Sequence, residues 1–200
     1  MQTAFLIIII PFLGTVIGAA CVFFMRGALH ENLRRGLGGF AAGVMTAASV
    51  WSLLLPAIDR SEGFGKRSFL PAVVGCWIGI LILMLLERAI AALQRRRHYH
   101  TPMPETRSPG RLLYLAVTLH NLPEGMAVGV VLSAALAGGM GVSMAAAFSL
   151  ALGVAIQNLP EGAIISMPLY ADWEKRGRAF LLGALSGAVE PLGALGTLML

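Results

Sequence analysis

Two copies of a short polar motif have the residue types to bind a metal ion. Residues 120–125 read HNLPEG and residues 157–162 read QNLPEG, and both copies lie within long apolar runs. A carboxylate at the centre of a membrane span costs roughly 2.5–3.5 kcal/mol on insertion scales, so it needs a partner group or an ion. Two carboxylates at matched positions, Glu124 and Glu161, therefore predict a metal site inside a membrane.

Helical spacing brings further donors beside these carboxylates. On a helix, positions three and four residues before Glu124 lie on neighbouring parts of the same face, and the second copy repeats this pattern. A third buried carboxylate, Glu190, precedes a proline as the other two follow one. Such an oxygen-rich set with one imidazole suits Zn²⁺, Fe²⁺, Mn²⁺ or Cd²⁺. The predicted ligands are His120, Asn121, Glu124, Gln157, Asn158, Glu161 and Glu190.

Proline and glycine should shape the backbone around the carboxylates. Pro123 and Pro160 each remove a backbone donor and clash with the carbonyl four residues earlier, so we expect a bend and a freed carbonyl in each helix. Gly125 and Gly162 leave no side chain next to each carboxylate, so we expect the two helices to approach until one ion can touch both carboxylates. Pairs of glycines four residues apart recur along the chain and favour a compact bundle.

The composition is that of a multi-pass membrane protein. Of 200 residues, 57% are hydrophobic and 12% are charged, beyond the usual shares in a soluble domain. A spanning helix needs about 20 mostly apolar residues. We therefore expect an all-α polytopic transmembrane bundle in a single domain, residues 1–200. Its six predicted spans are residues 3–25, 36–58, 69–93, 112–136, 140–168 and 179–200.

The basic residues lie in the connections between these spans. Eleven of the 15 Lys and Arg side chains fall in loops one, three and five, and three fall in loops two and four. The positive-inside rule then places the N-terminus outside. The longest connection, 94–111, is basic and contains three prolines, so we expect a flexible cytoplasmic loop. This placement of basic residues gives no indication of nucleic-acid binding.

At the paired hexapeptides, the basic loop and Glu190, the chain resembles the ZIP (Zrt/Irt-like) family of divalent metal transporters, in particular its bacterial GufA-like branch. The resemblance implies transport of Zn²⁺ towards the cytoplasm across a bacterial inner membrane, with a homodimer as the assembly. It also implies an elevator mechanism, in which spans 1, 4, 5 and 6 slide against the others. The family has eight spans, so we expect the last two to be missing from these 200 residues.

The resemblance further implies a binuclear metal centre in which Glu124 and Glu161 bridge two ions. One ion would bind His120, Glu124, Gln157 and Glu161, and the second would bind Asn121, Glu124, Asn158, Glu161 and Glu190.

Alternative interpretations remain for the function and for single residues. An ion-coupled carrier of a small organic solute would also use buried carboxylates and bent helices. An intramembrane metalloprotease would need a zinc site with a general base, but the HExxH motif is absent, so we do not expect an enzyme. His98 and His100 are further metal candidates in the loop, where an ordinary solvated loop is the alternative. Cys21 and Cys76 fit small buried hydrophobic residues.

Overall fold

The computed structural model describes residues 2–24, 30–100, 109–138, 142–173 and 175–199, which contain helices and no strand. The chain divides into two compact units, Met1–Leu53 with Ser108–Leu200, and Leu54–Arg107. The first unit holds α1 (Gln2–Ala20) with the 3-10 turn η1 (Cys21–Phe24), α2 (Glu31–Ala48), α5 (Pro109–Leu136), α6 (Met144–Trp173), α7 (Arg176–Gly187) and α8 (Val189–Leu198). The second unit holds α3 (Leu55–Asp59), the 3-10 helix η3 (Glu62–Arg67) and α4 (Leu70–His100); the π-helical turn η2 (Ser49–Leu54) leads into it.

The described residues contain five helical segments long and apolar enough to cross a membrane. They are Gln2–Phe24, Arg35–Asp59, Tyr114–Leu136, Met144–Tyr170 and Arg176–Leu198. These match five of the six predicted spans. The third predicted span, 69–93, falls in α4, whose apolar stretch Leu70–Leu85 is shorter than the others. The fold is therefore the expected multi-pass helical bundle, with five spanning-length helices among the described residues.

Both ends of the predicted loop 94–111 are helical in the structure. Helix α4 continues to His100 and α5 begins at Pro109. The residues between, 101–108, lie outside the described part of the chain. His98 belongs to α4, as His100 does, and the side chains of both also lie outside the described residues.

The last predicted span is interrupted close to its carboxylate. Helix α7 ends at Gly187 and α8 begins at Val189, with Ala188 between them. Proline clashes with the carbonyl four residues earlier, which for Pro191 is the carbonyl of Gly187. By contrast, α5 and α6 are continuous through Pro123 and Pro160. The break places Glu190 in the first turn of α8.

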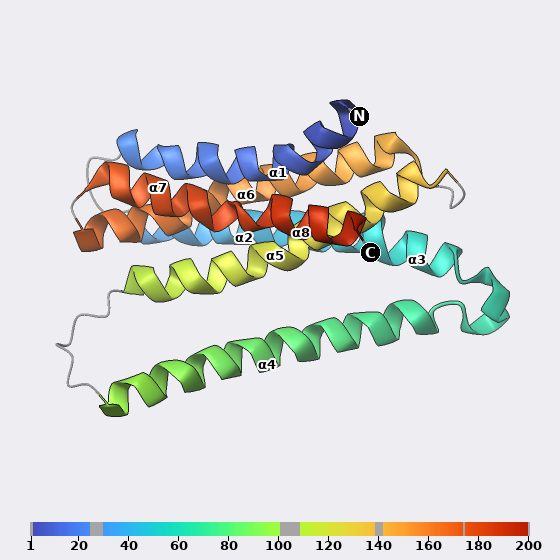
Figure 1. Cartoon of the computed structure of the whole chain (residues 1–200), viewed down its shortest axis with the longest axis horizontal. Coiled ribbons are helices and arrows are strands. Elements are labelled where there is room, and N and C mark those ends of the chain that lie inside the picture. Colours follow the sequence, from blue (N-terminus) through green and yellow to red (C-terminus); the bar gives the residue numbers. More distant parts are fainter. Residues whose placement is uncertain (1, 25–29, 101–108, 139–141, 174, 200) are drawn as a thin grey trace. The chain divides into compact units, whose positions relative to one another are not determined.

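In the first unit, α1 packs along α6, α7 contacts both of them, and α5 packs along α8 and α6 (Figure 1). Glycines allow these close contacts. A Cβ atom at Gly14 or Gly18 would overlap the backbone of α6, and one at Gly129 would overlap α8. Three of the five glycine pairs in the sequence, those starting at Gly14, Gly125 and Gly183, therefore lie at helix contacts. At the other two pairs a Cβ would meet no atom within 4 Å.

Candidate metal centre

A layer of polar side chains crosses the first unit between two apolar clusters. One cluster includes Ile7, Leu132 and Val154, and the other joins Val22, Ile165, Leu169 and Ala179. Along α1 and α6 the polar positions fall between the residues of these clusters, so apolar packing flanks the layer at both ends. We call these residues the polar layer: Thr15, His120, Asn121, Glu124, Gln157, Asn158, Glu161, Ser186 and Glu190.

One side of the polar layer gathers an imidazole and two carboxylates from α5 and α6. His120, Glu124 and Glu161 each offer a ligand atom, and these atoms lie within 4.8 Å of one another. His120 Nε2 lies 3.6 Å from Glu124 Oε1, as the i,i+4 spacing predicts. The His120 side chain is 44% exposed and that of Glu124 is 13% exposed. His120 thus lies at the accessible edge of the cluster, and the carboxylates lie deeper.

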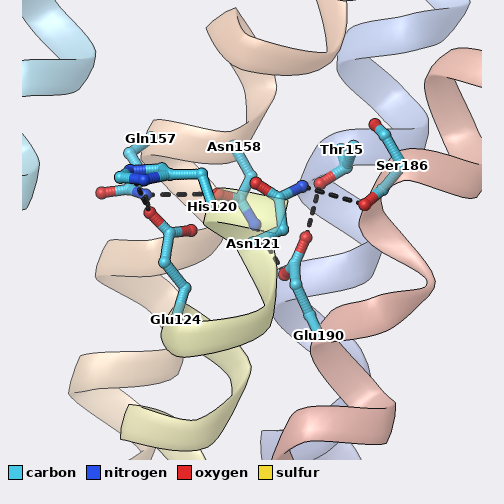
Figure 2. A network of polar contacts seen from close by, with 8 residues as sticks. All are labelled: Thr15, His120, Asn121, Glu124, Gln157, Asn158, Ser186 and Glu190. Atoms are coloured by element: carbon cyan, nitrogen blue, oxygen red, sulfur yellow. Dashed lines mark hydrogen bonds and ion pairs between the residues drawn. The ribbon is translucent and has the colours of Figure 1, made fainter. Parts of the chain in front are cut away.

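The amides of the second hexapeptide connect the two sides of the layer, as Figure 2 shows. Gln157 donates from Nε2 to Glu124 Oε1 at 2.5 Å and to Asn158 Oδ1 at 3.4 Å. Asn158 in turn donates from Nδ2 to Glu190 Oε2 at 2.7 Å and to the carbonyl of Pro11 at 3.2 Å. Both amide groups therefore turn their NH₂ ends towards acceptors, and hydrogen bonds run from Glu124 to Glu190.

The first hexapeptide makes different contacts. Asn121 is fully buried and donates from Nδ2 to the carbonyl of Ser186 at 3.2 Å. This contact turns its amide towards α7, whereas His120 and Glu124 meet on the side of α6 (Figure 2). Asn121 and Glu124 thus contact different helices, α7 and α6, although they lie on one face of α5.

Three buried oxygens of the layer have no hydrogen-bond partner within the described part of the chain. They are Asn121 Oδ1, Glu124 Oε2 and Glu161 Oε2. An unsatisfied buried acceptor costs about 1–3 kcal/mol, and more if it is charged. Carboxylate and amide oxygens are also ligands for divalent cations. All three residues are among the predicted ligands, and their chemistry fits a cation.

Glycines bring the helices of this layer together. A Cβ atom at Gly125 would lie 2.6 Å from Glu190 Cα, and one at Gly162 would lie 2.7 Å from the backbone nitrogen of Ala19. Real Cβ atoms do not approach other atoms so closely. Each glycine therefore lies at a close helix contact, but neither contact is the predicted one between α5 and α6. For Gly125 the partner is the backbone of the third carboxylate, and for Gly162 it is α1.

The structure also supplies site residues that the motifs did not indicate. Thr15 is buried in α1 and donates from Oγ1 to Glu190 Oε1 at 3.0 Å. The carbonyls of Pro11 and Ser186 accept from the two asparagines. Backbone carbonyls carry no side-chain signal in a sequence. Thr15 does carry one, because it is a hydroxyl residue between Gly14 and Gly18 in an apolar run.

These features define a multi-pass helical membrane protein with an oxygen-rich polar layer between its helices. No protein-family model matches the chain, but curated proteins do. Zinc transporter ZIP11 of Xenopus tropicalis is 33% identical, and the match covers 92% of this chain and 76% of that protein. Zinc transporter ZIPB of Bordetella bronchiseptica is 33% identical, covering 92% and 58%, and zinc transporter GufA of Myxococcus xanthus is 35% identical, covering 78% and 60%.

The chain belongs to the ZIP family, as the resemblance at the hexapeptides indicates, and GufA is one of its relatives. The relatives are named as transporters, so the chain is a transport protein and not an enzyme.

Proposed function

We propose that this protein carries Zn²⁺ across a membrane towards the cytoplasm, with the polar layer as its transport site. The observation that carries the proposal is the set of three buried acceptor oxygens, on Asn121, Glu124 and Glu161, that find no donor among the described residues. A divalent cation would satisfy all three and balance the carboxylate charge. The similarity to three zinc transporters supports zinc as the substrate. The proposal includes transport of Cd²⁺, Fe²⁺ and Mn²⁺ by the same site.

The proposed site holds two ions bridged by Glu124 and Glu161. The first would bind near His120 and Gln157, where the imidazole and both carboxylates already converge. The second would bind towards Asn121, Asn158 and Glu190. Binding of either ion requires amide rotation, because Gln157 and Asn158 now direct NH₂ groups at the carboxylates. Figure 2 supports this division, since the two asparagines lie between the Glu124 side and the Glu190 side.

For the movement, we propose that α1, α5, α6 and α7 with α8 slide as one body in an elevator mechanism. These helices correspond to predicted spans 1, 4, 5 and 6. Their mutual packing through glycines supports their moving together, since separation would open the contacts at Gly18, Gly125 and Gly162. We also propose that α4 is a further span and that the N-terminus lies outside. The protein would form a homodimer in a bacterial inner membrane.

Zinc uptake by reconstituted protein tests the function. The purified protein is placed in liposomes that contain a zinc-sensing dye, and influx is compared with that of a Glu124→Ala and Glu161→Ala double variant. Glu62→Ala removes an exposed carboxylate in η3 and serves as the matched control. We expect influx with the unaltered protein and the control, and none with the double variant. Influx that survives the double substitution would exclude the proposed site, and no influx with the unaltered protein would exclude zinc transport.

A further inference from the structure

The three carboxylates of the polar layer differ in how their oxygens are bonded. Glu124 and Glu161 each have a buried oxygen that no donor reaches from the parts of the chain that the structure describes. Glu190 is 1% exposed, and both of its oxygens accept hydrogen bonds, Oε1 from Thr15 and Oε2 from Asn158. Glu190 is thus already fixed in position, with one oxygen held by α1 and the other by α6.

The contact from Thr15 is not the one that a helical threonine usually makes. Within a helix the threonine hydroxyl commonly donates to the carbonyl four residues earlier, as Thr118 does to Tyr114. For Thr15 that carbonyl belongs to Pro11, and Asn158 donates to it instead. The Thr15 hydroxyl is directed across the helix contact to α8.

Thr15 is packed against glycines of two helices. A Cβ atom at Gly187 would lie 2.7 Å from Thr15 Cβ, 2.8 Å from Thr15 Oγ1 and 2.9 Å from Thr15 Cγ2. A Cβ atom at Gly162 would overlap the Thr15 carbonyl oxygen. Thr15 therefore packs directly on the backbone of α6 and of α7, and its side chain is fully buried. The Gly187 contact thus confines the Thr15 side chain, the Gly162 contact confines its backbone, and the hydrogen bond to Glu190 gives the direction of the hydroxyl.

From this geometry we propose that Thr15 is a positioning residue that makes Glu190 a one-oxygen ligand of the transported ion. By holding Oε1 against α1, Thr15 leaves only Oε2 on the side of Asn158 and of the site. Oε2 is then the oxygen that exchanges between the Asn158 amide and the metal. The inference rests on the proposed function, because it requires that the polar layer binds the transported cation.

Two substitutions separate the hydroxyl from the packing. Thr15→Val keeps nearly the same volume and removes the hydroxyl, whereas Thr15→Ser keeps the hydroxyl and removes the methyl group that faces Gly187. Zinc affinity of the purified protein is measured by isothermal titration calorimetry in detergent. Because a hydrogen bond to a charged group is among the stronger ones, we expect Thr15→Val to weaken zinc binding about tenfold. Thr15→Ser should stay within about twofold of the unaltered protein.

A second measurement connects the effect to Glu190. In protein that carries Glu190→Ala, Thr15→Val should cause no further loss of affinity, since the hydroxyl then has no carboxylate to position. If Thr15→Val does not fold, Thr15→Ala replaces it in the comparison with Thr15→Ser, because alanine fits wherever serine does.

The outcomes distinguish the inference from the function. Weak binding with valine that serine restores supports the role of Thr15. Unchanged affinity with valine, or a loss with serine and not with valine, overturns it and leaves the proposed function intact. If the unaltered protein binds no zinc, the proposed function fails and the role of Thr15 fails with it.

Discussion

Replacing Gly125 by alanine tests whether close helix contact maintains the polar layer. The new Cβ atom would lie 2.6 Å from Cα and from the carbonyl carbon of Glu190, about 0.8 Å short of the 3.4 Å at which ordinary contact begins. Both neighbours are backbone atoms, so a side-chain rotation cannot relieve the overlap. Helices α5 and α8 must move apart, and Glu190 must move with α8.

Alanine at position 125 should destabilise the protein, although glycine to alanine usually stabilises a helix. In an open helical position, glycine to alanine stabilises a helix by about 1 kcal/mol. Overpacking at a tight contact costs roughly 1–3 kcal/mol, so the net effect of Gly125→Ala should be a loss of stability. Metal–ligand distances vary by only about 0.2 Å, so moving Glu190 by about 0.8 Å would take it out of bonding distance of an ion held by the other proposed ligands. We therefore expect zinc influx to fall.

The matched control is Gly153→Ala in α6, where a new Cβ atom would meet no neighbour within 4 Å. Both variants are compared for zinc influx in liposomes and for melting temperature in detergent. The control should melt at or above the temperature of the unaltered protein and transport normally. Equal influx and equal melting temperatures for Gly125→Ala and Gly153→Ala would refute the argument.

Two further substitutions address individual ligands. His120→Gln makes the two hexapeptides identical and replaces an imidazole nitrogen, which zinc prefers, with an amide oxygen. Calorimetry should show zinc affinity reduced about tenfold. An unchanged affinity would exclude His120 as a ligand. Asn158→Leu removes donors from both the Pro11 carbonyl and Glu190, so the melting temperature should fall further than for Asn121→Leu, which loses one bond to Ser186. Equal melting temperatures for the two variants would contradict this.

Much of the bundle could be predicted because membrane spans depend on local composition. Five of the six predicted spans coincide with helical segments of spanning length. The structure departs from the prediction after position 93, where basic residues and prolines favour a loop. Arginine is a good helix former, and α4 continues to His100. The break before Glu190 follows from Pro191 by the steric rule that also holds for Pro123 and Pro160.

Those two prolines, however, lie within helices that continue on both sides. A proline clash can be absorbed by a bend when neighbouring helices hold the segment in place. At Pro191 the preceding residues include Gly183 and Gly187, which weaken the helix intrinsically. The sequence therefore indicates where strain occurs, whereas tertiary packing determines whether the helix bends or ends.

For the site, spacing along one helix could be predicted and contacts between helices could not. The approach of His120 to Glu124 follows from i,i+4 geometry alone. The partners of Asn121 and Asn158 depend on which helix packs against each face, and this information is absent from the motif. The contribution of α1, through Thr15 and the Pro11 carbonyl, comes from a segment without any charged residue.

The two hexapeptides also cannot play equal parts, although they are nearly identical. Asn158 donates to Glu190 Oε2, whereas Asn121 donates to the backbone carbonyl of Ser186. Within the described part of the chain, Asn121 Oδ1 has no donor. Asn158 Oδ1, in contrast, accepts from Gln157. In the proposed transport, a cation that enters the layer would meet an open amide oxygen from the first copy and an occupied one from the second, so the duplicated motif is asymmetric because its two asparagines contact different helices.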